Sequence, residues 1–502
     1  MGKLLNSVGG KVGKLIIGLM DKECEKDGLM LENFLRKRYI DPELELCDKC
    51  DLTFKFLGNP TFAAAEKLLK VDRDWLSGRL RSEYGESWLR GIVSIAKGVK
   101  EFGVREPFVP ASPILIVWNL TYQCNLRCKH CYENAGLARK AELNEEEARY
   151  ALEQMKEANV AAIAFSGGEP LVRKDFFELA KLAHDSGMYV SIASNGTLIS
   201  RKVAKKLKEV GVDYVEISLD GIGKAHDEFR GIPGAFERTL KGIKNCLAEG
   251  IDTCIATTGW KGNLEEILKV AELADKLGAR FIHFNYIPVG RGTKELDITP
   301  REREELLEEL ALKNLRNYVE NGRGDRVLST APQFGRKTKE IAEKLGIEYF
   351  VATHYGGLSS SSEEKMKSIK STANFIGGCG AGRLYLALEP NGDILPCTFF
   401  PRNMKVGNIL EDDLIEVWEE NELLWDLRDR EKLKYVEIGG EKIGCGVCEN
   451  KYICGGCRAR AVAYFDDPLA PDPGCIKNEK IFASLEEGVR ASLLPTPSIR
   501  SR

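Results

Sequence analysis

The spacing of apolar residues along the first 110 positions predicts helices. Apolar side chains recur at intervals of three, four and seven residues, as they do on one buried helical face. The clearest examples are Phe62, Leu68, Leu69 and Trp75, followed by Trp88, Leu89, Ile92 and Ile95. We therefore expect an amino-terminal helical domain over residues 1–110, joined to the rest by the proline-bounded segment Pro107–Pro113.

From residue 111 the pattern changes to short β-rich runs that alternate with amphipathic helical stretches. The expected strands are Ile114–Asn119, Val160–Phe165, Tyr189–Ser194, Tyr214–Ser218, Thr253–Thr258 and Phe281–Ile287. The clearest helices between them are Asn144–Ala158, Lys174–Ser186 and Asn263–Leu277. Six strand–helix repeats predict an α/β domain over residues 111–321 with a parallel sheet, either doubly wound or a partial barrel.

Three further segments follow this domain. Residues 322–378 interrupt the repeat with a long insertion that contains the run Ser359–Ser362, and we expect either a mobile lid or a disordered loop there. Its His354 and Tyr355 are either substrate contacts or solvated loop residues. Residues 379–480 are rich in cysteine, and residues 481–502 form a tail.

Composition excludes several classes of protein. Of the 502 residues 43% are hydrophobic and 30% charged, and no apolar run approaches the length needed to span a bilayer. A net charge of −3 gives no cationic field for phosphates, so we expect no nucleic acid partner. Fifteen cysteines without a secretory signal favour metal or redox sites in a cytoplasmic protein over a disulfide framework.

The first cysteine group follows the first predicted strand directly. Cys124, Cys128 and Cys131 form a C-x3-C-x2-C loop. Three thiolates on one compact loop can hold three irons of a [4Fe–4S] cubane and leave the fourth iron without a protein ligand. A zinc site would need a fourth ligand at typical spacing, and His130 is adjacent to Cys131 instead of suitably separated.

This loop and a series of strand-end motifs resemble the radical S-adenosylmethionine (SAM) superfamily. The second strand is followed by the Gly-Gly-Glu-Pro (GGEP) motif, and similar motifs follow the third, fourth and sixth strands, where α/β folds build their sites. Tight turns are the alternative explanation for single glycines in these motifs. The four motifs are Gly167–Pro170, Ser194–Thr197, Ser218–Gly221 and Pro288–Gly292.

The resemblance implies specific cofactor contacts. It implies a partial (β/α)6 TIM-like barrel in which a [4Fe–4S] cluster on the three cysteines cleaves SAM to a 5′-deoxyadenosyl radical. His130 would lie near the adenine, and Ser218 and Arg230 near the SAM carboxylate. His226, Asp227 and Arg230 could instead form a helix cap and a surface ion pair. The implied SAM-binding residues are His130, Gly167, Gly168, Glu169, Pro170, Ser194, Asn195, Ser218, Asp220 and Arg230.

The second cysteine group resembles the SPASM extension of radical enzymes, which houses two auxiliary [4Fe–4S] clusters. The family arrangement assigns Cys445, Cys448, Cys454 and Cys475 to an outer cluster. It assigns Cys379, Cys397 and Cys457 to an inner cluster, whose fourth ligand is not assigned. Only two glycines separate Cys454 from Cys457, one residue fewer than is usual in the family. A zinc ribbon would explain only the two CxxC pairs.

The remaining cysteines lie outside both groups. Cys47 and Cys50 have metal-ligand spacing, but with Cys24 they supply only three thiolates, so packing is the alternative. Cys246 and Cys254 are expected in the core.

The extreme amino terminus has an amphipathic pattern. An apolar stripe is flanked by lysines, and interior glycines make such a helix marginal in water. We expect it to fold on a surface, either a membrane interface or the body of the protein. The stripe comprises Leu4, Leu5, Val8, Val12, Leu15, Ile16 and Leu19, and the lysines are Lys3, Lys11, Lys14 and Lys22.

Together these features predict a radical SAM enzyme that abstracts hydrogen from an unactivated C–H bond. Of its three expected [4Fe–4S] clusters, the two auxiliary ones would support an oxidative modification or C–C bond formation. The amphipathic terminus favours a long apolar substrate such as an archaeal membrane lipid, and peripheral attachment to the inner face of a membrane. A peptide or a tetrapyrrole side chain is the alternative substrate. The non-enzymatic alternative is an iron–sulfur electron-transfer or scaffold protein. A reductant such as ferredoxin or flavodoxin is the expected partner.

Overall fold

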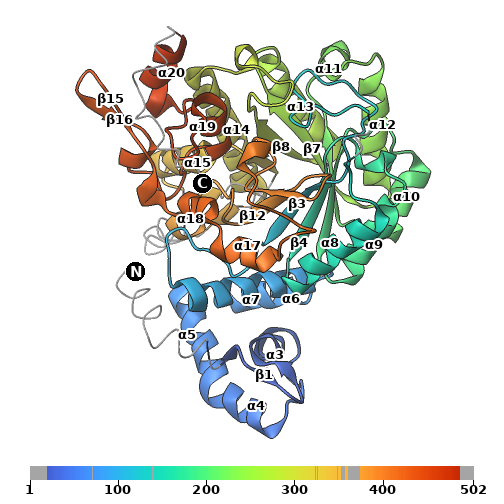
Figure 1. Ribbon diagram of the computed structural model, residues 1–502, viewed down its shortest axis with the longest axis vertical. Coiled ribbons are helices and arrows are strands. Elements are labelled where there is room, and N and C mark those ends of the chain that lie inside the picture. Colours follow the sequence, from blue (N-terminus) through green and yellow to red (C-terminus); the bar gives the residue numbers. More distant parts are fainter. Residues whose placement is uncertain are drawn as a thin grey trace.

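The computed structural model of the chain comprises a barrel-like body and a smaller amino-terminal lobe (Figure 1). It describes residues 18, 20–69, 72–137, 141–322, 324, 326–347, 349–351, 357–359 and 373–486. The predicted amphipathic stripe, His354, Tyr355 and residues 487–502 of the tail therefore lie outside the described residues. Within the described residues, no helix combines the length and apolarity required to cross a bilayer.

A ten-stranded sheet forms the centre of the body, in the order β14-β13-β12-β3-β4-β5-β6-β7-β8-β9. Six strands match the six predicted ones and run parallel to one another, which confirms the α/β partial barrel. They are β3 (Leu115–Asn119), β4 (Ala162–Ser166), β5 (Tyr189–Ser194), β6 (Tyr214–Ser218), β7 (Asp252–Gly259) and β8 (Arg280–Asn285).

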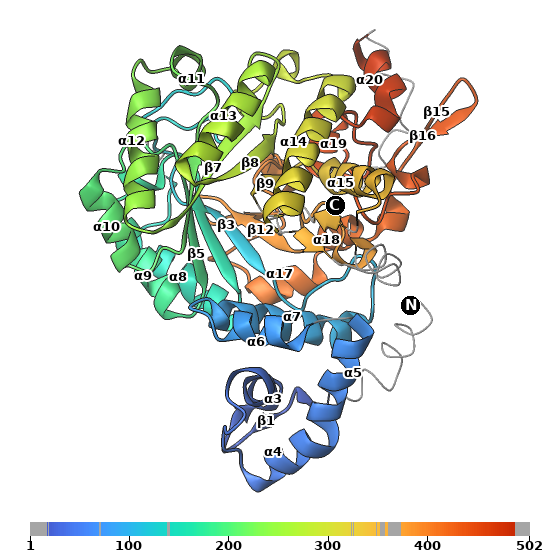
Figure 2. The same ribbon diagram turned by 180° about the vertical axis from the view of Figure 1, so that it is seen from behind.

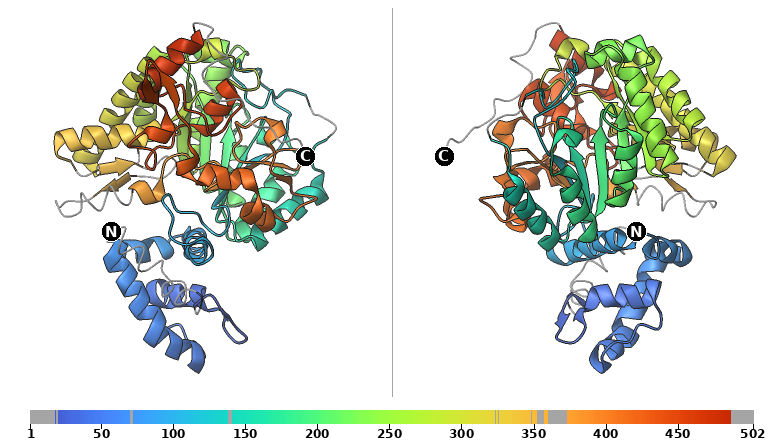
Figure 3. Two further views of the ribbon diagram at one scale, coloured as in Figure 1. Left: turned by 60° about the vertical axis from the view of Figure 1, so that its left-hand side comes forward. Right: turned by 90° about the vertical axis from the view of Figure 1, so that its right-hand side faces the viewer.

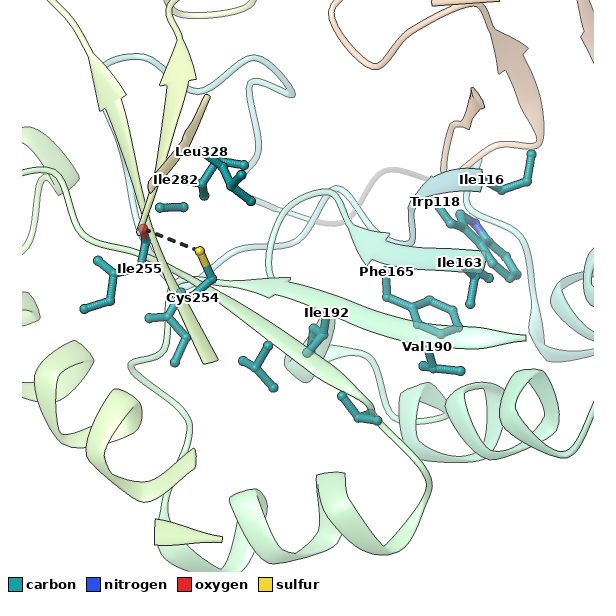
Figure 4. Close-up of a cluster of buried hydrophobic side chains, with 14 of the residues drawn as sticks. Ile116, Trp118, Ile163, Phe165, Val190, Ile192, Cys254, Ile255, Ile282 and Leu328 are labelled. Atoms are coloured by element: carbon teal, nitrogen blue, oxygen red, sulfur yellow. Dashed lines mark hydrogen bonds between the residues drawn. The ribbon is translucent and has the colours of Figure 1, made fainter. Parts of the chain in front are cut away.

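Helices cover the outer face of this sheet (Figures 1 and 2). Alternate strand residues, among them Ile163, Phe165, Val190 and Ile192, share one hydrophobic core with the helices and are fully buried (Figure 4). The residues between them face the barrel interior, because successive side chains alternate across a strand. The helices are α8 (Glu145–Glu157), α9 (Phe176–Asp185), α10 (Arg201–Glu209), α11 (Lys224–Arg230), α12 (Ala235–Ala248), α13 (Leu264–Leu277) and α14 (Pro300–Asn321).

The predicted cysteine-rich segment contributes a strand to the same sheet. Strand β12 (Tyr385–Leu388) pairs in parallel with β3, so that Leu386 lies opposite Ile116. Antiparallel strands β13 (Asp393–Leu395) and β14 (Gly407–Asn408) extend the edge. The rest contains α17 (Leu414–Glu420), α18 (Glu422–Arg428), the hairpin β15 (Val436–Ile438) and β16 (Glu441–Ile443), α19 (Arg458–Phe465) and α20 (Glu479–Glu486).

Part of the predicted insertion belongs to the folded body. Strand β9 (Val327–Ser329) pairs in parallel with β8, and α15 (Gln333–Leu345) packs on α14. The expectation of a lid or loop over all of residues 322–378 is therefore wrong for these two elements. A small antiparallel pair, β10 (Tyr349–Val351) and β11 (Gly357–Ser359), follows them.

The amino-terminal residues form the separate lobe seen in Figure 3. It is mostly helical, as predicted, and it also contains the short hairpin β1 (Glu23–Cys24) and β2 (Gly28–Leu29). Its last helix contacts the barrel, since Arg90 donates hydrogen bonds to the carbonyl oxygens of Val160 and Ser186. The helices are α3 (Met30–Leu35), α4 (Asp48–Thr53), α5 (Asn59–Leu69), α6 (Arg73–Leu80) and α7 (Gly85–Phe102).

Candidate active site

The predicted cluster loop leaves the carboxyl end of β3 and carries its three cysteines close together. Each thiol sulfur accepts a hydrogen bond: Cys124 from the backbone N–H of Leu126 (3.4 Å), Cys131 from that of Ala135 (3.3 Å), and Cys128 from the Arg230 guanidinium (3.6 Å). Burial raises the pKa of Cys124 to about 12 and also raises that of Cys131. Thiols that are at least half-buried and accept such bonds fit a cationic metal cluster, because metal coordination ionises them.

The segment after β8 holds this loop in place. Arg291 donates to the carbonyl oxygens of Cys128 (2.9 Å) and Ala135 (2.7 Å), and its backbone N–H donates to that of Cys131 (2.9 Å). Gly290 has φ +64°, and a Cβ there would lie 2.3 Å from the Cys131 oxygen. The Pro288–Gly292 motif therefore packs its backbone directly against the cluster loop.

The GGEP motif lies beside the chain that leads into the cluster loop. The N–H of Gly168 donates to the Thr121 oxygen and that of Glu169 to the Gln123 oxygen, both at 2.8 Å. A Cβ on Gly168 would lie only 2.0 Å from the Gln123 oxygen, which explains the absence of a side chain. Pro170 is buried and begins a short 3-10 turn.

Glu169 is fully buried and connects this motif to the next strand end. Its carboxylate accepts hydrogen bonds from the Ser194 hydroxyl (2.9 Å) and the Asn195 backbone N–H (2.8 Å). Burial raises the pKa of Glu169 to about 7. The Asn195 amide in turn donates to the Asn125 side chain on the cluster loop (2.8 Å), so GGEP, the third strand end and the loop form one network.

The motif after β6 contains a buried ion pair. Arg230 donates to an Asp220 carboxylate oxygen (2.6 Å), and the other oxygen accepts the Thr258 backbone N–H (2.9 Å). The alternative of a surface ion pair is wrong, because Arg230 is 8% exposed and its partner is Asp220. His226 accepts a hydrogen bond from the Asp220 backbone N–H. Ser218 ends β6 and is half-buried on the face opposite the helices.

A stack that starts at His130 includes two aromatic residues that the sequence did not single out. The rings of His130 and Phe229 lie parallel at 4.3 Å, and Trp260 stacks on the other face of Phe229 at the same distance. Burial holds the pKa of His130 well below its usual range, so the ring is neutral. Phe229 lies on α11 and Trp260 directly after β7. Only the fold brings them beside the cluster loop.

Strands β4 and β5 present mainly small residues to the barrel interior, and β6 adds a further carboxylate. Ala164, Ser191 and Ala193 occupy the positions that alternate with the core residues of β4 and β5. Glu216 occupies the corresponding face of β6, two residues before Ser218, and burial raises its pKa to about 7. Alternation along the strand could have identified Glu216 from the sequence, because it is a charged residue between apolar ones.

The predicted outer ligands line one cavity in the cysteine-rich region. Its wall includes Cys445, Cys448, Cys454 and Cys475. The Arg458 guanidinium donates to the Cys445 sulfur (3.4 Å), and the Gly456 N–H donates to the Cys454 sulfur (3.3 Å). Four thiols around one space, with hydrogen-bond donors at two of the sulfurs, fit an iron–sulfur cluster.

The predicted inner ligands form a second group. Cys379, Cys397 and Cys457 are buried in one apolar cluster, and the Tyr385 hydroxyl donates to the Cys397 sulfur (3.3 Å). The two glycines between Cys454 and Cys457 have φ of +70° and +65°. This turn separates the two neighbouring cysteines, because Cys454 lines the outer cavity while Cys457 belongs to the inner group.

The remaining five cysteines lie in two separate parts of the fold. Cys246 and Cys254 are fully buried in the barrel core, as predicted. Cys24, Cys47 and Cys50 lie together in the amino-terminal lobe with Asp27.

Two protein-family profiles match the chain. The profile of the radical SAM superfamily matches residues 118–274, and that of an iron–sulfur cluster-binding domain, SPASM, matches residues 379–450. The first match contains the cluster loop and the first three strand-end motifs. The second begins at Cys379.

Characterised relatives extend over most of the chain. The AdoMet-dependent heme synthase of Methanosarcina barkeri is 36% identical, over 73% of this chain and 97% of its own length. The mycofactocin maturase MftC of Mycolicibacterium smegmatis is 29% identical, over 77% and 88% respectively. Among solved structures, Streptococcus suis SuiB bound to the precursor peptide SuiA shares the fold, with a TM-score of 0.56 and 20% identity over 78% of this chain and 81% of that one.

Proposed function

Because this chain belongs to the radical SAM superfamily, with a SPASM domain, and is an enzyme, we propose that Cys124, Cys128 and Cys131 hold a [4Fe–4S] cluster with one iron left free for SAM. Such a cluster supplies the electron that cleaves SAM to methionine and a 5′-deoxyadenosyl radical, which takes a hydrogen atom from the substrate. The single observation that supports this assignment is the loop of one buried and two half-buried thiols with a hydrogen bond to every sulfur.

The surrounding residues have distinct roles in this proposal. The GGEP motif and Glu169 receive the SAM amino group, because Glu169 is a buried carboxylate already oriented by Ser194 and Asn195. His130 borders the adenine site, oriented by its stack on Phe229. Asp220 positions Arg230, whose guanidinium stabilises negative charge on Cys128 and faces the SAM carboxylate site together with Ser218.

The seven cysteines of the carboxyl-terminal region hold two further [4Fe–4S] clusters in this proposal, an outer one with four ligands and an inner one with three. Clusters at these positions supply an acceptor for the electron that the substrate radical loses in an oxidative reaction. Ferredoxin or flavodoxin supplies the electron for the first cluster.

We propose that the substrate is a tetrapyrrole and that the reaction takes place on one of its propionate or acetate side chains. The M. barkeri relative, which is named a heme synthase, supports this substrate class. Its similarity to this chain extends over 97% of its own length. A lipid is less well supported, since the stripe that favoured it lies outside the described residues and neither relative described above is named for a lipid. A peptide is the second candidate, because MftC is a maturase and SuiB binds a precursor peptide.

The experiment uses anaerobically reconstituted protein, dithionite, SAM and an iron porphyrin with deuterated propionate side chains. Transfer of deuterium into 5′-deoxyadenosine, together with a porphyrin product of lower mass, is the expected result. The variant Cys246→Ala, which removes a thiol outside the cysteine groups, serves as a control and should give the same result as the wild type. SAM cleavage without deuterium transfer would exclude the propionate side chains of this porphyrin while leaving the radical chemistry intact.

A further inference from the structure

Four potential ligands meet in the amino-terminal lobe, far along the chain from the clusters described above. They are the thiols of Cys24, Cys47 and Cys50 and the carboxylate of Asp27, and their ligand atoms all lie within 4.8 Å of one another. Cys50 is buried and the other three are half-buried. The sequence alone identifies the three cysteines as possible ligands. The fold adds Asp27 as the fourth.

Two short elements bring these ligands together. Cys24 ends β1 and Asp27 lies in the hairpin turn, where Gly28 has φ +73°. Cys47 immediately precedes α4, and Cys50 lies in that helix. Each element therefore contributes two ligands separated by two residues, the spacing that zinc sites commonly use. The Cys47 backbone N–H donates to the Asp27 carboxylate (3.0 Å), which joins the two elements.

The distances favour a single ion over a cluster. The sulfurs of Cys24 and Cys47 lie 3.6 Å apart. Tetrahedral zinc with bonds of about 2.3 Å places its sulfur ligands roughly 3.8 Å apart. In a cubane each thiolate binds a different iron, so its ligands lie further apart than that. A disulfide would use two of the thiols and leave the third beside Asp27 without a role.

We propose that Cys24, Asp27, Cys47 and Cys50 bind one structural zinc ion. The set contains four ligands with no open position, which is typical of structural zinc sites. Cys50 belongs to the lobe's small core with Leu31 and Phe34, so the ion would connect the hairpin to that core. Such a small core gains stability from a metal that crosslinks its loops.

The test uses the full-length protein, purified anaerobically from medium supplemented with zinc. Metal analysis should find about one zinc per chain besides the cluster iron. The zinc X-ray absorption spectrum should fit three sulfurs at about 2.3 Å and one oxygen at about 2.0 Å. Zinc below about 0.2 per chain, an all-nitrogen and oxygen shell, or a mononuclear iron in its place would overturn the proposal.

Variants distinguish this site from adventitious zinc. Cys50→Ala should lose the zinc and leave the iron content unchanged, whereas Cys246→Ala should keep both. Asp27→Cys should retain one zinc and change the shell to four sulfurs, which does not depend on Cys50→Ala folding. Zinc retained in Cys50→Ala, or three sulfurs persisting in Asp27→Cys, would overturn the assignment. Because the readouts are zinc content and zinc ligation, they are independent of SAM cleavage and of the proposed substrate.

Discussion

Several positions around the cluster loop require a particular residue type. The reason is the close approach of neighbouring backbone segments as well as side-chain chemistry. At Gly168 the neighbouring carbonyl oxygen of Gln123 occupies the space that a Cβ would need. The backbone N–H groups of Gly168 and Glu169 donate to the Thr121 and Gln123 oxygens, and these two bonds fix the backbone at Glu169. A side chain at position 168 would therefore displace the carboxylate that we assign to the SAM amino group.

Gly168→Ala should lower kcat/KM for SAM cleavage by at least about tenfold, because small displacements of positioning groups are costly. The rate of 5′-deoxyadenosine formation at several SAM concentrations measures this effect. Gly78→Ala is the control, since a Cβ there meets nothing within 4 Å. Equal rates for the two variants would contradict the assignment of the GGEP motif.

The buried His283 should make the free energy of unfolding depend on pH. Burial, with Arg303 and Arg460, lowers its pKa to about 3 from an ordinary value of 6.5. The folded state therefore favours the neutral ring. The resulting contribution to the free energy of unfolding is fully present above pH 6.5 and is lost as the pH falls toward 3. Between pH 7.5 and 5 it amounts to about 2 kcal/mol.

His283→Asn should remove that part of the pH dependence, because asparagine can still bond Ser329 but does not titrate. Denaturant midpoints at pH 7.5 and 5 measure the difference. The exposed His184→Asn should resemble the wild type. A wild-type-like pH slope in His283→Asn would show that other groups are responsible.

Among the elements, the six barrel strands follow from sequence, because alternating apolar residues and turn signals are local features. β9 and β12 were not predicted, since β9 is only three residues long and β12 joins the sheet beside β3, which lies far from it along the chain. The candidate site divides in the same way. Its cysteines and strand-end motifs are visible locally, whereas α11 brings Phe229 onto His130 and the segment after β7 brings Trp260 onto Phe229 only in the folded chain.

Phe229→Leu tests this three-element stack. Leucine keeps most of the apolar contact but loses the parallel rings, which are worth about 0.5–1.5 kcal/mol. We expect KM for SAM to rise roughly threefold to tenfold with a smaller change in kcat. Phe108→Leu is the control, because Phe108 stacks on Phe375 elsewhere in the fold. A change confined to kcat would argue against a role in binding SAM.

Across the whole molecule, the cysteines form spatially separate groups, and the sheet joins two of the regions that hold them. Strand β12 connects the cysteine-rich region to β3, the strand that leads into the cluster loop. The structure thus links the proposed site of SAM cleavage to the proposed electron acceptors through adjacent strands. The amino-terminal lobe has its own core and its own ligand group.

Cys448→Ala separates these functions. It should remove about four of roughly twelve irons per chain and still allow SAM cleavage, because the first cluster does not depend on the outer cavity. Formation of the oxidised product should fall strongly. Iron analysis and product mass spectrometry measure the two effects. Loss of all SAM cleavage with the first cluster intact would contradict this division of roles.

The most direct test of the account is 5′-deoxyadenosine formation by anaerobically reconstituted wild-type protein and Cys128→Ala, given SAM and dithionite. The account predicts continuous formation by the wild type and by Cys246→Ala. It predicts none above background by Cys128→Ala, which should retain the irons of the other two clusters. Wild-type protein that carries a full complement of iron but leaves SAM intact would contradict it.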